Sequence, residues 1–432
     1  MGKGRATARR SKGTPRRYRN GRAVSAKSAS RTRDPGLWHL ARRTAATAAE
    51  LVELESPFLA ECWLSSLVSI WEDAYLVDAD PEKVIGLSVV DAAASEASPR
   101  ALALLSGLAV LGGKRVGPRA RTEARRLDGR RDEAPRWLDA LGRARLVGSW
   151  KTHEPFGDGD MVTLVLQHAG YQAHAIGVLI DHNLGSMAKD VLVADDAGSL
   201  KSLWEHEVPG VTVVDIDTQE AADALAHGLE IEGMYLNSPA TEELREFRPL
   251  LRCYLRTLPS PRAIHPPSFD ERDRDRLAAE FAASVEAHGL DPAVIDDLAC
   301  RVVDFGCDYS DGDPLRWSPT VVELFMTDWL PRKALLEAPL KGVPDTVRAW
   351  VRFAGRKRGL NESLIEETVT AVERWEREFA KAMKDSTRFG PAKAIVGAML
   401  AEGIELTDQA SVDAWIRDFN GRPEEQRRKV LP

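Results

Sequence analysis

The stretch that decides the fold is residues 161–196, MVTLVLQHAGYQAHAIGVLIDHNLGSMAKDVLVADD. Its apolar residues follow the pattern of strands rather than that of helices. Two such runs, Met161–His168 and Tyr171–Ile180, flank Ala169 and Gly170, a short turn with a glycine where a hairpin needs a positive φ. The sequence therefore predicts two antiparallel strands joined by a two-residue turn.

Three histidines lie in or next to these strands, and their spacing decides whether they can share a metal ion. A turn at residues 169–170 pairs Val165 with His174, which places His168 and His174 on opposite faces of the sheet. His182 has the parity of His174 but lies roughly 26 Å further along the strand, at about 3.3 Å per residue. We therefore do not expect a zinc site built from these histidines.

The strand pair runs into the polar segment Asp181–Gly185, the most chemically dense short stretch of the chain. Asp181 and His182, with Asn183 beside them, are candidates for a catalytic general-base dyad. The alternative is structural, with Asn183 or Gly185 in the left-handed conformation that reverses a chain.

The hairpin belongs to a predicted α+β domain that covers residues 144–258. After the polar segment, Ala188–Ala194 and Val211–Ile216 have the composition of strands, and helical periodicity follows over Gln219–Leu229 and Glu242–Leu258. Short strands followed by helices are typical of α+β domains.

Aspartates accompany the strand ends of this domain. Asp190, Asp195 and Asp196, together with Asp158 and Asp160, offer the carboxylates that Mg²⁺ prefers and that metal-dependent phosphoester hydrolysis uses. Aspartates at strand ends are also common turn formers. The sequence thus leaves a magnesium site and a set of turns as alternatives.

Helical periodicity dominates the rest of the chain, so the predicted fold class is α+β and mainly α. A helical domain is expected over residues 35–143 and a second one over residues 269–432. The segment 259–268 contains a high density of prolines and predicts a semi-rigid linker between the last two domains.

The first residues have a different character. Residues 1–33, the basic arm, hold 12 Lys or Arg and no acid, and we expect residues 1–34 to be disordered. The chain carries −7 overall and the arm +12, which leaves −19 on the remainder. Such an arm can bind nucleic acid through phosphates without reading bases, or contact a membrane surface, or fold back on the acidic body. The candidate phosphate-contacting residues are Arg9, Arg10, Arg16, Arg17, Arg19 and Arg22.

A second basic cluster lies in the last predicted domain, at the end of a helix that stops before Gly359. It consists of Arg352, Arg356, Lys357 and Arg358. These side chains either form an anion-binding site or complement the negative end of the helix dipole.

Composition bounds the class of protein. With 432 residues, 44% of them hydrophobic and 29% charged, the chain is long enough for two or three globular domains. Its four cysteines include no C-x-x-C pair, which agrees with a reducing compartment and disfavours a zinc knuckle. No apolar run reaches the ~18 residues that a membrane span needs. We expect a cytoplasmic protein.

Four segments are distinctive, and in chain order they are Ile180-Asp-His-Asn-Leu-Gly185, Trp329-Leu-Pro-Arg-Lys333, Ala349-Trp-Val-Arg-Phe-Ala-Gly355 and Phe389-Gly-Pro-Ala-Lys393. Together they resemble segments of a family of large actinobacterial hypothetical proteins without an assigned function. The resemblance covers most of the chain after the basic arm. It implies a cytoplasmic bacterial protein and carries over no catalytic residue.

The sequence as a whole favours a nucleic-acid-associated binding or regulatory protein that uses the basic arm. The alternative is a metal-dependent hydrolase that uses carboxylates of the α+β domain, with Mg²⁺ as its cofactor. No complete catalytic or cofactor signature is present, so the sequence does not decide whether the protein is an enzyme.

Overall fold

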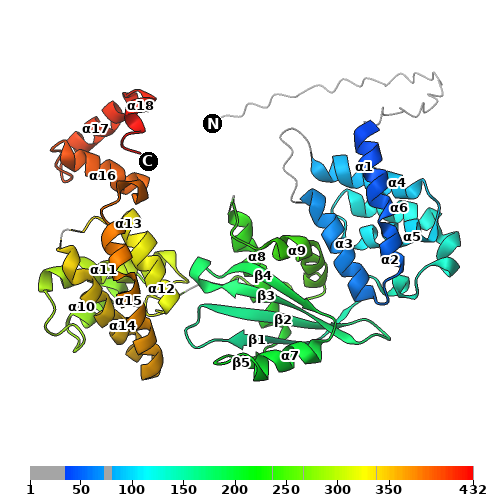
Figure 1. Cartoon of the computed structure of the whole chain (residues 1–432), viewed down its shortest axis with the longest axis horizontal. Coiled ribbons are helices and arrows are strands. Elements are labelled where there is room, and N and C mark those ends of the chain that lie inside the picture. Colours follow the sequence, from blue (N-terminus) through cyan, green and yellow to red (C-terminus); the bar gives the residue numbers. More distant parts are fainter. Residues whose placement is uncertain (1–34, 73–79, 236, 266, 337, 432) are drawn as a thin grey trace, which may run out of the picture.

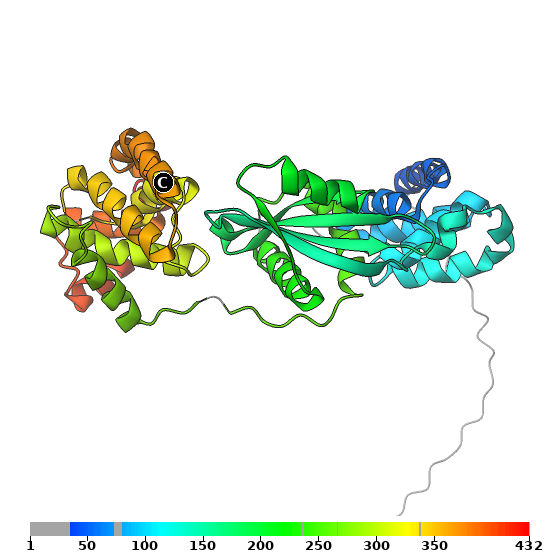
Figure 2. The ribbon, with the colours of Figure 1, turned by 90° about the horizontal axis from the view of Figure 1, so that it is seen from below.

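The computed structural model describes residues 35–72, 80–235, 237–265, 267–336 and 338–431. The predictions for the basic arm lie outside the described residues. Within them the chain forms two lobes (Figure 1), joined by an extended segment, residues 259–265 and 267–270, that is drawn below the sheet in Figure 2. The predicted α+β, mainly α class is confirmed, because an antiparallel sheet lies in the middle of the chain with helices before and after it.

The sheet has five strands in the order β4-β3-β2-β1-β5, and every neighbouring pair is antiparallel. Its strands are β1 (Arg145–His153), β2 (Gly159–Gln167), β3 (Ala173–Asp181), β4 (Met187–Ala194) and β5 (Thr212–Asp215). Alternate residues face opposite sides, as the pleat requires. Leu164 and Leu166 therefore face the main core, while Val165 packs with Trp150 on the other side.

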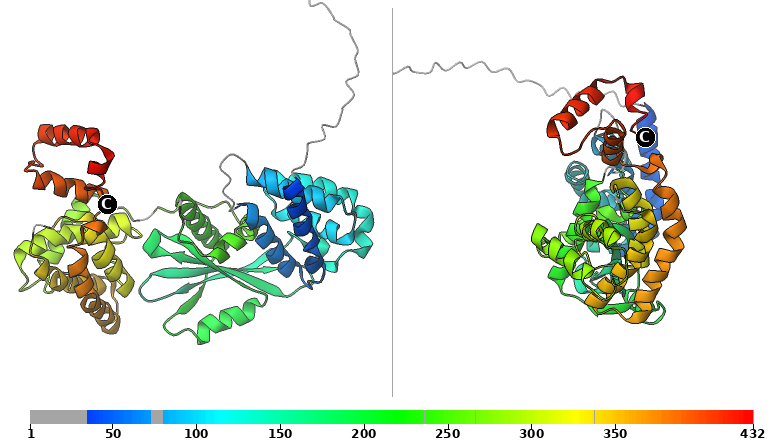
Figure 3. Two further views of the ribbon diagram at one scale, coloured as in Figure 1. Left: turned by 45° about the horizontal axis from the view of Figure 1, so that its top comes forward. Right: turned by 90° about the vertical axis from the view of Figure 1, so that its left-hand side faces the viewer.

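Two layers of helices cover the sheet. The helix α7 (Ala197–His206) packs on the face that carries Trp150, and α8 (Thr218–Met234) and α9 (Glu242–Leu255) lie against the other face (Figure 3). The N-terminal helices adjoin α9 and close the same core. They are α1 (Pro35–Ala46), α2 (Ala48–Val52), α3 (Pro57–Glu72), α4 (Leu87–Ala94), α5 (Pro99–Leu111) and α6 (Val116–Arg126).

The predicted boundary near residue 143 does not separate two cores. Leu64 of α3, Leu108 of α5 and Leu164 of β2 are completely buried in one continuous cluster, so the N-terminal helices and the sheet form a single lobe. A Cβ atom at Gly107 would lie 2.1 Å from Cδ1 of Leu64. The helices α3 and α5 can therefore lie in direct contact because this position is glycine.

The second lobe is helical and has its own core around Phe281, Phe325 and Trp350. The rings of Phe281 and Trp350 meet edge to face with centroids 5.1 Å apart, a favoured aromatic geometry. Its larger helices are α10 (Glu271–Ala282), α11 (Pro292–Tyr309), α12 (Pro319–Glu323), α13 (Leu330–Lys333), α14 (Val343–Arg358) and α15 (Glu362–Ala382). A π-helical turn, Leu324–Trp329, joins α12 to α13.

The last helices form a small appendage with a separate core of Met399, Trp415 and Phe419. They are α16 (Pro391–Ala401), α17 (Gln409–Gly421) and α18 (Glu424–Arg427), at the red end of the chain in Figure 1. Among the described residues, no helix is long and apolar enough to cross a membrane.

The hairpin register differs from the prediction by one residue. Leu166 pairs with His174 and Gln167 with Ala173, so the connection contains residues 168–172 rather than a two-residue turn. This shift turns His174 to the face that carries Leu166. The prediction that His168 and His174 lie on opposite faces is therefore wrong, since their rings stack with centroids 5.2 Å apart.

Candidate functional site at the seam between the lobes

The polar segment after β3 forms a tight turn at the edge of the sheet lobe. The Asp181 carboxylate accepts a hydrogen bond from the backbone N–H of Asn183 at 2.9 Å, and it forms an ion pair with Lys189 at 2.6 Å. Gly185 has φ of 70°, which is the left-handed conformation that glycine adopts at little cost in free energy because it has no Cβ atom. The structural alternative predicted for this segment thus accounts for both Asp181 and Gly185.

Asp181 and His182 do not form the predicted dyad, because their side chains have different partners. Ser186 Oγ lies 2.9 Å from His182 Nδ1, and Asp160 Oδ2 lies 3.4 Å from His182 Nε2. Serine, histidine and aspartate are the residue types of a hydrolytic triad. Here, however, the serine belongs to the same turn as the histidine, and none of the three lines the cavity beside them. We interpret the contacts of His182 with Ser186 and Asp160 as structural, because they stabilise the turn.

The turn meets the second lobe through Arg316, whose side chain is only 2% exposed. The guanidinium donates to Asp158 Oδ1 at 2.8 Å and to Asn183 Oδ1 at 2.9 Å, both in the sheet lobe. Within its own lobe it also pairs with Asp311 at 2.8 Å. Charge-assisted bonds from one planar guanidinium to several partners fix orientation as well as distance, so Arg316 holds the two lobes in register.

Asp158 receives further bonds from the second lobe. The Ser318 hydroxyl donates to Asp158 Oδ1 at 2.8 Å, and Ser318 also caps the start of α12. On the sheet side, the amide of His182 donates to the carbonyl of Asp158 at 2.9 Å. The loop between β1 and β2, the turn after β3 and the start of α12 are thereby joined at one residue, Asp158, through its carbonyl and its carboxylate.

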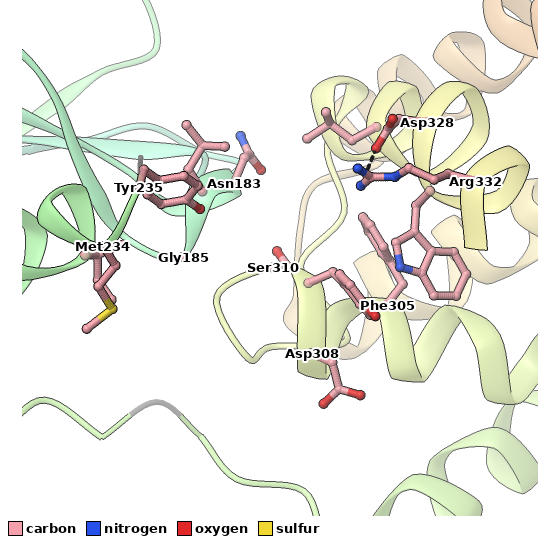
Figure 4. A pocket seen from close by; sticks show the side chains of 14 residues that line it. Asn183, Gly185, Met234, Tyr235, Phe305, Asp308, Ser310, Asp328 and Arg332 are labelled. Atoms are coloured by element: carbon pink, nitrogen blue, oxygen red, sulfur yellow. Dashed lines mark ion pairs between the residues drawn. The ribbon is translucent and has the colours of Figure 1, made fainter. Parts of the chain in front are cut away.

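A cavity of about 510 Å³, the seam pocket, lies beside this junction and between the lobes. Figure 4 shows Asn183, Met234 and Tyr235 on its sheet side and Phe305 and Ser310 across from them. Most of its lining is aromatic or aliphatic. The remaining residues around it are Leu184, Gly185, Ile231, Asp308, Tyr309, Leu324, Asp328, Trp329 and Arg332.

The charged residues of the seam pocket are paired with one another or with neighbours. Asp328 pairs with Arg332 at 2.8 Å, drawn as a dashed line in Figure 4. Asp308 pairs with Arg274 at 2.6 Å, and hydrogen bonds from that guanidinium hold the pKa of Asp308 below its usual range. The pocket is therefore close to neutral and suits an uncharged, partly apolar group.

The π-helical turn contributes one wall of the seam pocket. Pro331 lacks an N–H group and so cannot donate to the carbonyl of Thr327, which removes one regular helical bond at this point. The Thr327 carbonyl accepts instead from Arg388 at 3.4 Å. Single π-turns inside helices are frequent at functional sites.

Trp329 ends this turn and is 8% exposed. Its ring packs against Phe305 and Tyr309 with centroids 5.5 and 5.6 Å apart. Its indole N–H is buried and has no hydrogen-bond partner among the described residues. The indole N–H groups of Trp71, Trp150, Trp204 and Trp350 are likewise buried without a partner among the described residues, so this N–H does not by itself indicate a ligand.

Three of the four segments that resemble the actinobacterial family lie around or behind the seam pocket. The segment 180–185 lines its sheet side and the segment 329–333 its helical side. Behind the latter, the amine of Lys393 donates to the Pro331 carbonyl at 2.7 Å, and the amide of Gly390 donates to the Arg332 carbonyl at 2.9 Å. Three segments that are far apart in the sequence therefore lie together: residues 180–185 and 329–333 line the pocket, and residues 389–393 hold the segment 329–333 in place from behind.

The basic cluster near the end of α14 is already paired with carboxylates. Arg352 contacts Glu366 at 3.0 Å and Arg356 contacts Glu286 at 2.7 Å, while Lys357 contacts Glu280. Arg358 donates to the Phe156 carbonyl at 3.1 Å and so belongs to the seam between the lobes. An anion would have to displace these partners, and the contacts favour a structural role for the cluster.

The aspartates predicted as magnesium ligands are not brought together. Asp190, in the middle of β4, accepts hydrogen bonds from Thr241 at 2.7 Å and from the Val191 amide at 2.8 Å. Asp195 and Asp196 follow the end of β4, and Asp196 caps α7. Among the described residues, no three His, Cys, Asp or Glu side chains are grouped as a metal site requires. The hydrolase alternative stays a prediction without a supporting observation in the described residues.

The arginines predicted to contact nucleic acid, Arg9 to Arg22, lie outside the described residues. Comparison of the chain with protein-family models, with curated proteins and with solved structures finds no match. The resemblance to the actinobacterial family stays a prediction.

Sequence analysis missed Arg316 and the partnership of Asp158 with the second lobe. These two residues are separated by 158 positions, and neither lies in a recognisable motif. The Trp329–Lys333 segment did carry a signal, because a tryptophan followed closely by proline in a helical region predicts an irregular turn.

Proposed function

We propose that the protein is a nucleic-acid-associated binding protein in which the seam pocket takes an unpaired base and the basic arm holds nearby phosphates. The observation that carries the proposal is the aromatic lining of the seam pocket, which Tyr235, Phe305, Tyr309 and Trp329 form. Aromatic side chains stack on bases of any sequence, at roughly 1–3 kcal/mol per base.

Charge supports a division of roles between the pocket and the arm. The charged residues around the seam pocket are paired, so the pocket suits a base rather than a phosphate. The arm carries 12 cationic residues and no acid, which suits phosphates rather than bases. An exposed tyrosine on each lobe, Tyr235 at 43% and Tyr309 at 46%, stands at the pocket for stacking.

The pocket also explains why the lobes are held together. A ligand between two lobes is bound by both only if their separation is fixed, and Arg316 fixes it. A base in the seam pocket would lie beside Asn183, whose amide side chain belongs to the same lining.

The experiment compares a labelled oligothymidylate with an abasic strand of equal length by fluorescence anisotropy. The full chain should bind the strand with bases about tenfold tighter or more, as expected from a stacked base. Replacing Tyr235 by alanine should reduce this preference without unfolding the protein, because the side chain is exposed. The control is Leu203→Ala on α7, which is 42% exposed and lies on the far face of the sheet. Equal affinity of the full chain for the two strands would contradict base binding.

A further inference from the structure

A second polar site lies inside the sheet lobe, at the opposite end of the β2–β3 hairpin from the seam pocket. Four side chains, His168, Glu61, Tyr254 and His174, form a hydrogen-bonded chain there. His168 Nε2 lies 3.1 Å from Glu61 Oε1, the Tyr254 hydroxyl donates to Glu61 Oε2 at 2.7 Å, and His174 Nε2 lies 3.1 Å from the same hydroxyl. None of the four is more than 1% exposed.

The carboxylate sets the direction of every bond in this chain. Glu61 can only accept when ionised, and it also accepts from the Gly142 amide at 2.7 Å, so His168 Nε2 carries a hydrogen. The Tyr254 hydrogen is used on Glu61, so His174 Nε2 donates to the phenol oxygen. In the neutral rings, Nδ1 of both histidines is left as an acceptor.

His174 is the neutral ring that this arrangement needs, because burial and the nearby His168 lower its pKa to about 3. Nδ1 of His168 is buried and has no hydrogen-bond partner among the described residues. The two rings lie nearly parallel, at 19°. A pair of stacked imidazoles is therefore backed by a buried carboxylate, and Nδ1 of His168 is an acceptor that no described group satisfies.

A cavity of about 290 Å³, the hairpin cavity, adjoins these rings. Its lining includes both histidines, the aromatic side chains of Phe58 and Tyr171, and the carboxylate residues Glu55 and Asp195. No lysine or arginine is part of this lining in the described structure. Acceptors, carboxylates and aromatic faces in one cavity favour a cation that carries N–H donors.

We propose that the hairpin cavity binds a small primary ammonium ion, with its N–H groups on Nδ1 of His168 and His174. Its carbon chain packs against Phe58 and Tyr171. Glu61 adds a buried negative charge behind the histidines, and Glu55 adds a second charge in the lining. This site is independent of the seam pocket, since the two share no residue.

Isothermal titration of the full chain with propylammonium chloride tests the proposal. Tetramethylammonium, which is a cation without N–H donors, and propionate, which is an anion of similar size, serve as comparison ligands. We expect saturable binding of propylammonium, with tetramethylammonium about tenfold weaker, the effect of one lost hydrogen bond of roughly 1.4 kcal/mol.

Two variants and a matched control locate the binding. Glu55→Gln should weaken propylammonium binding about threefold, as expected for one exposed charge, and Glu53→Gln, the same change two residues away, should not. His174→Phe keeps a ring against Phe58 and should abolish binding. Binding of propionate in place of propylammonium, equal affinity in His174→Phe, or no saturable heat from protein with an ordinary melting temperature would overturn the proposal.

Discussion

At the scale of single residues, burial decides the charge of His174. Its ring stacks on Phe58 with centroids 4.1 Å apart and is 1% exposed. Burial, followed by the neighbouring His168, lowers its pKa from 6.5 to about 3. In the unfolded chain this pKa returns to its ordinary value. Between these two values the unfolded state therefore binds one more proton than the folded state.

We predict that the free energy of unfolding decreases as the pH falls from 6.5 towards 3, because the unfolded chain then binds a proton at His174 that the folded protein does not. Above pH 6.5 the contribution of neutral His174 to stability is fully present. The loss amounts to at most about 1.4 kcal/mol per pH unit. Urea unfolding of the full chain at several pH values measures the slope. The His174→Phe variant should show a shallower slope, and an identical slope in both proteins would show that His174 is not responsible.

His182 gives a second prediction at this scale. Its ring connects Ser186, which has φ of 64°, to Asp160. We expect His182→Ala to lower the free energy of unfolding by roughly 1–2 kcal/mol. The variant loses the hydrogen bond to Ser186, and the turn that this bond stabilises can then relax. Nucleic-acid binding should not change. An unchanged denaturation midpoint together with lost binding would assign His182 to function instead.

At the scale of elements, the strands with strong alternation were predictable and the weaker one was not. The strands predicted at 161–168 and 171–180 correspond to β2 and β3, displaced by about one or two residues. The strand β1, RLVGSWKTH, was missed because its polar residues and Gly148 hide the alternation. It is a strand because β2 and β5 pair with it on both sides.

The hairpin shows how one residue changes the candidate chemistry. Gly170 has φ of 83°, as the turn signal predicted, but the connection includes three more residues than expected. Loop length fixes register, and register fixes which face each side chain occupies. The buried histidine pair was therefore beyond prediction from the turn residues alone.

The segment between the lobes carries a prediction about proteolysis. The prolines of region 259–267 bury little surface, which predicts that its backbone is open to proteases. Arg262 in this region is held by Asp223 of α8, with bonds from its amide at 2.7 Å and from its guanidinium at 2.8 Å. We expect limited trypsin digestion to cut after Arg262, and Asp223→Asn to accelerate this cut severalfold. Cleavage within α9 ahead of this segment, detected by mass spectrometry, would contradict the boundary.

At the scale of the whole molecule, the sequence predicts a semi-rigid linker between two lobes but not the seam that holds them together. Prolines at 259–268 indicate a linker, and the two lobes do have separate cores. The seam depends on Arg316 meeting Asp158 and Asn183, which are more than 130 positions away. Such partners come together only through tertiary packing, and local composition does not reveal them.

We therefore predict that the arrangement of the two lobes depends on Arg316. Arg316→Ala leaves two carboxylates in the seam without their main partner, at a cost on the order of 3 kcal/mol. Small-angle X-ray scattering should show a larger radius of gyration, because the seam then loses the Arg316 bonds to Asp158 and Asn183 and keeps those from Ser318 and Arg358. The control is Arg352→Ala, whose partner Glu366 is in the same lobe. A compact Arg316→Ala protein would show that the seam does not depend on this residue.

The central claim is that the protein holds nucleic acid, with phosphates on the basic arm. The most direct measurement is the affinity of the full chain and of a variant without residues 1–33 for a labelled single strand and a labelled duplex, at 50 and 200 mM salt. The account predicts binding by the full chain that weakens by about 10³ between the two salt concentrations if roughly six phosphates are neutralised. It also predicts that the truncated protein keeps its melting temperature and loses most of this affinity. Equal binding by the two proteins, or no binding by either, would contradict the account.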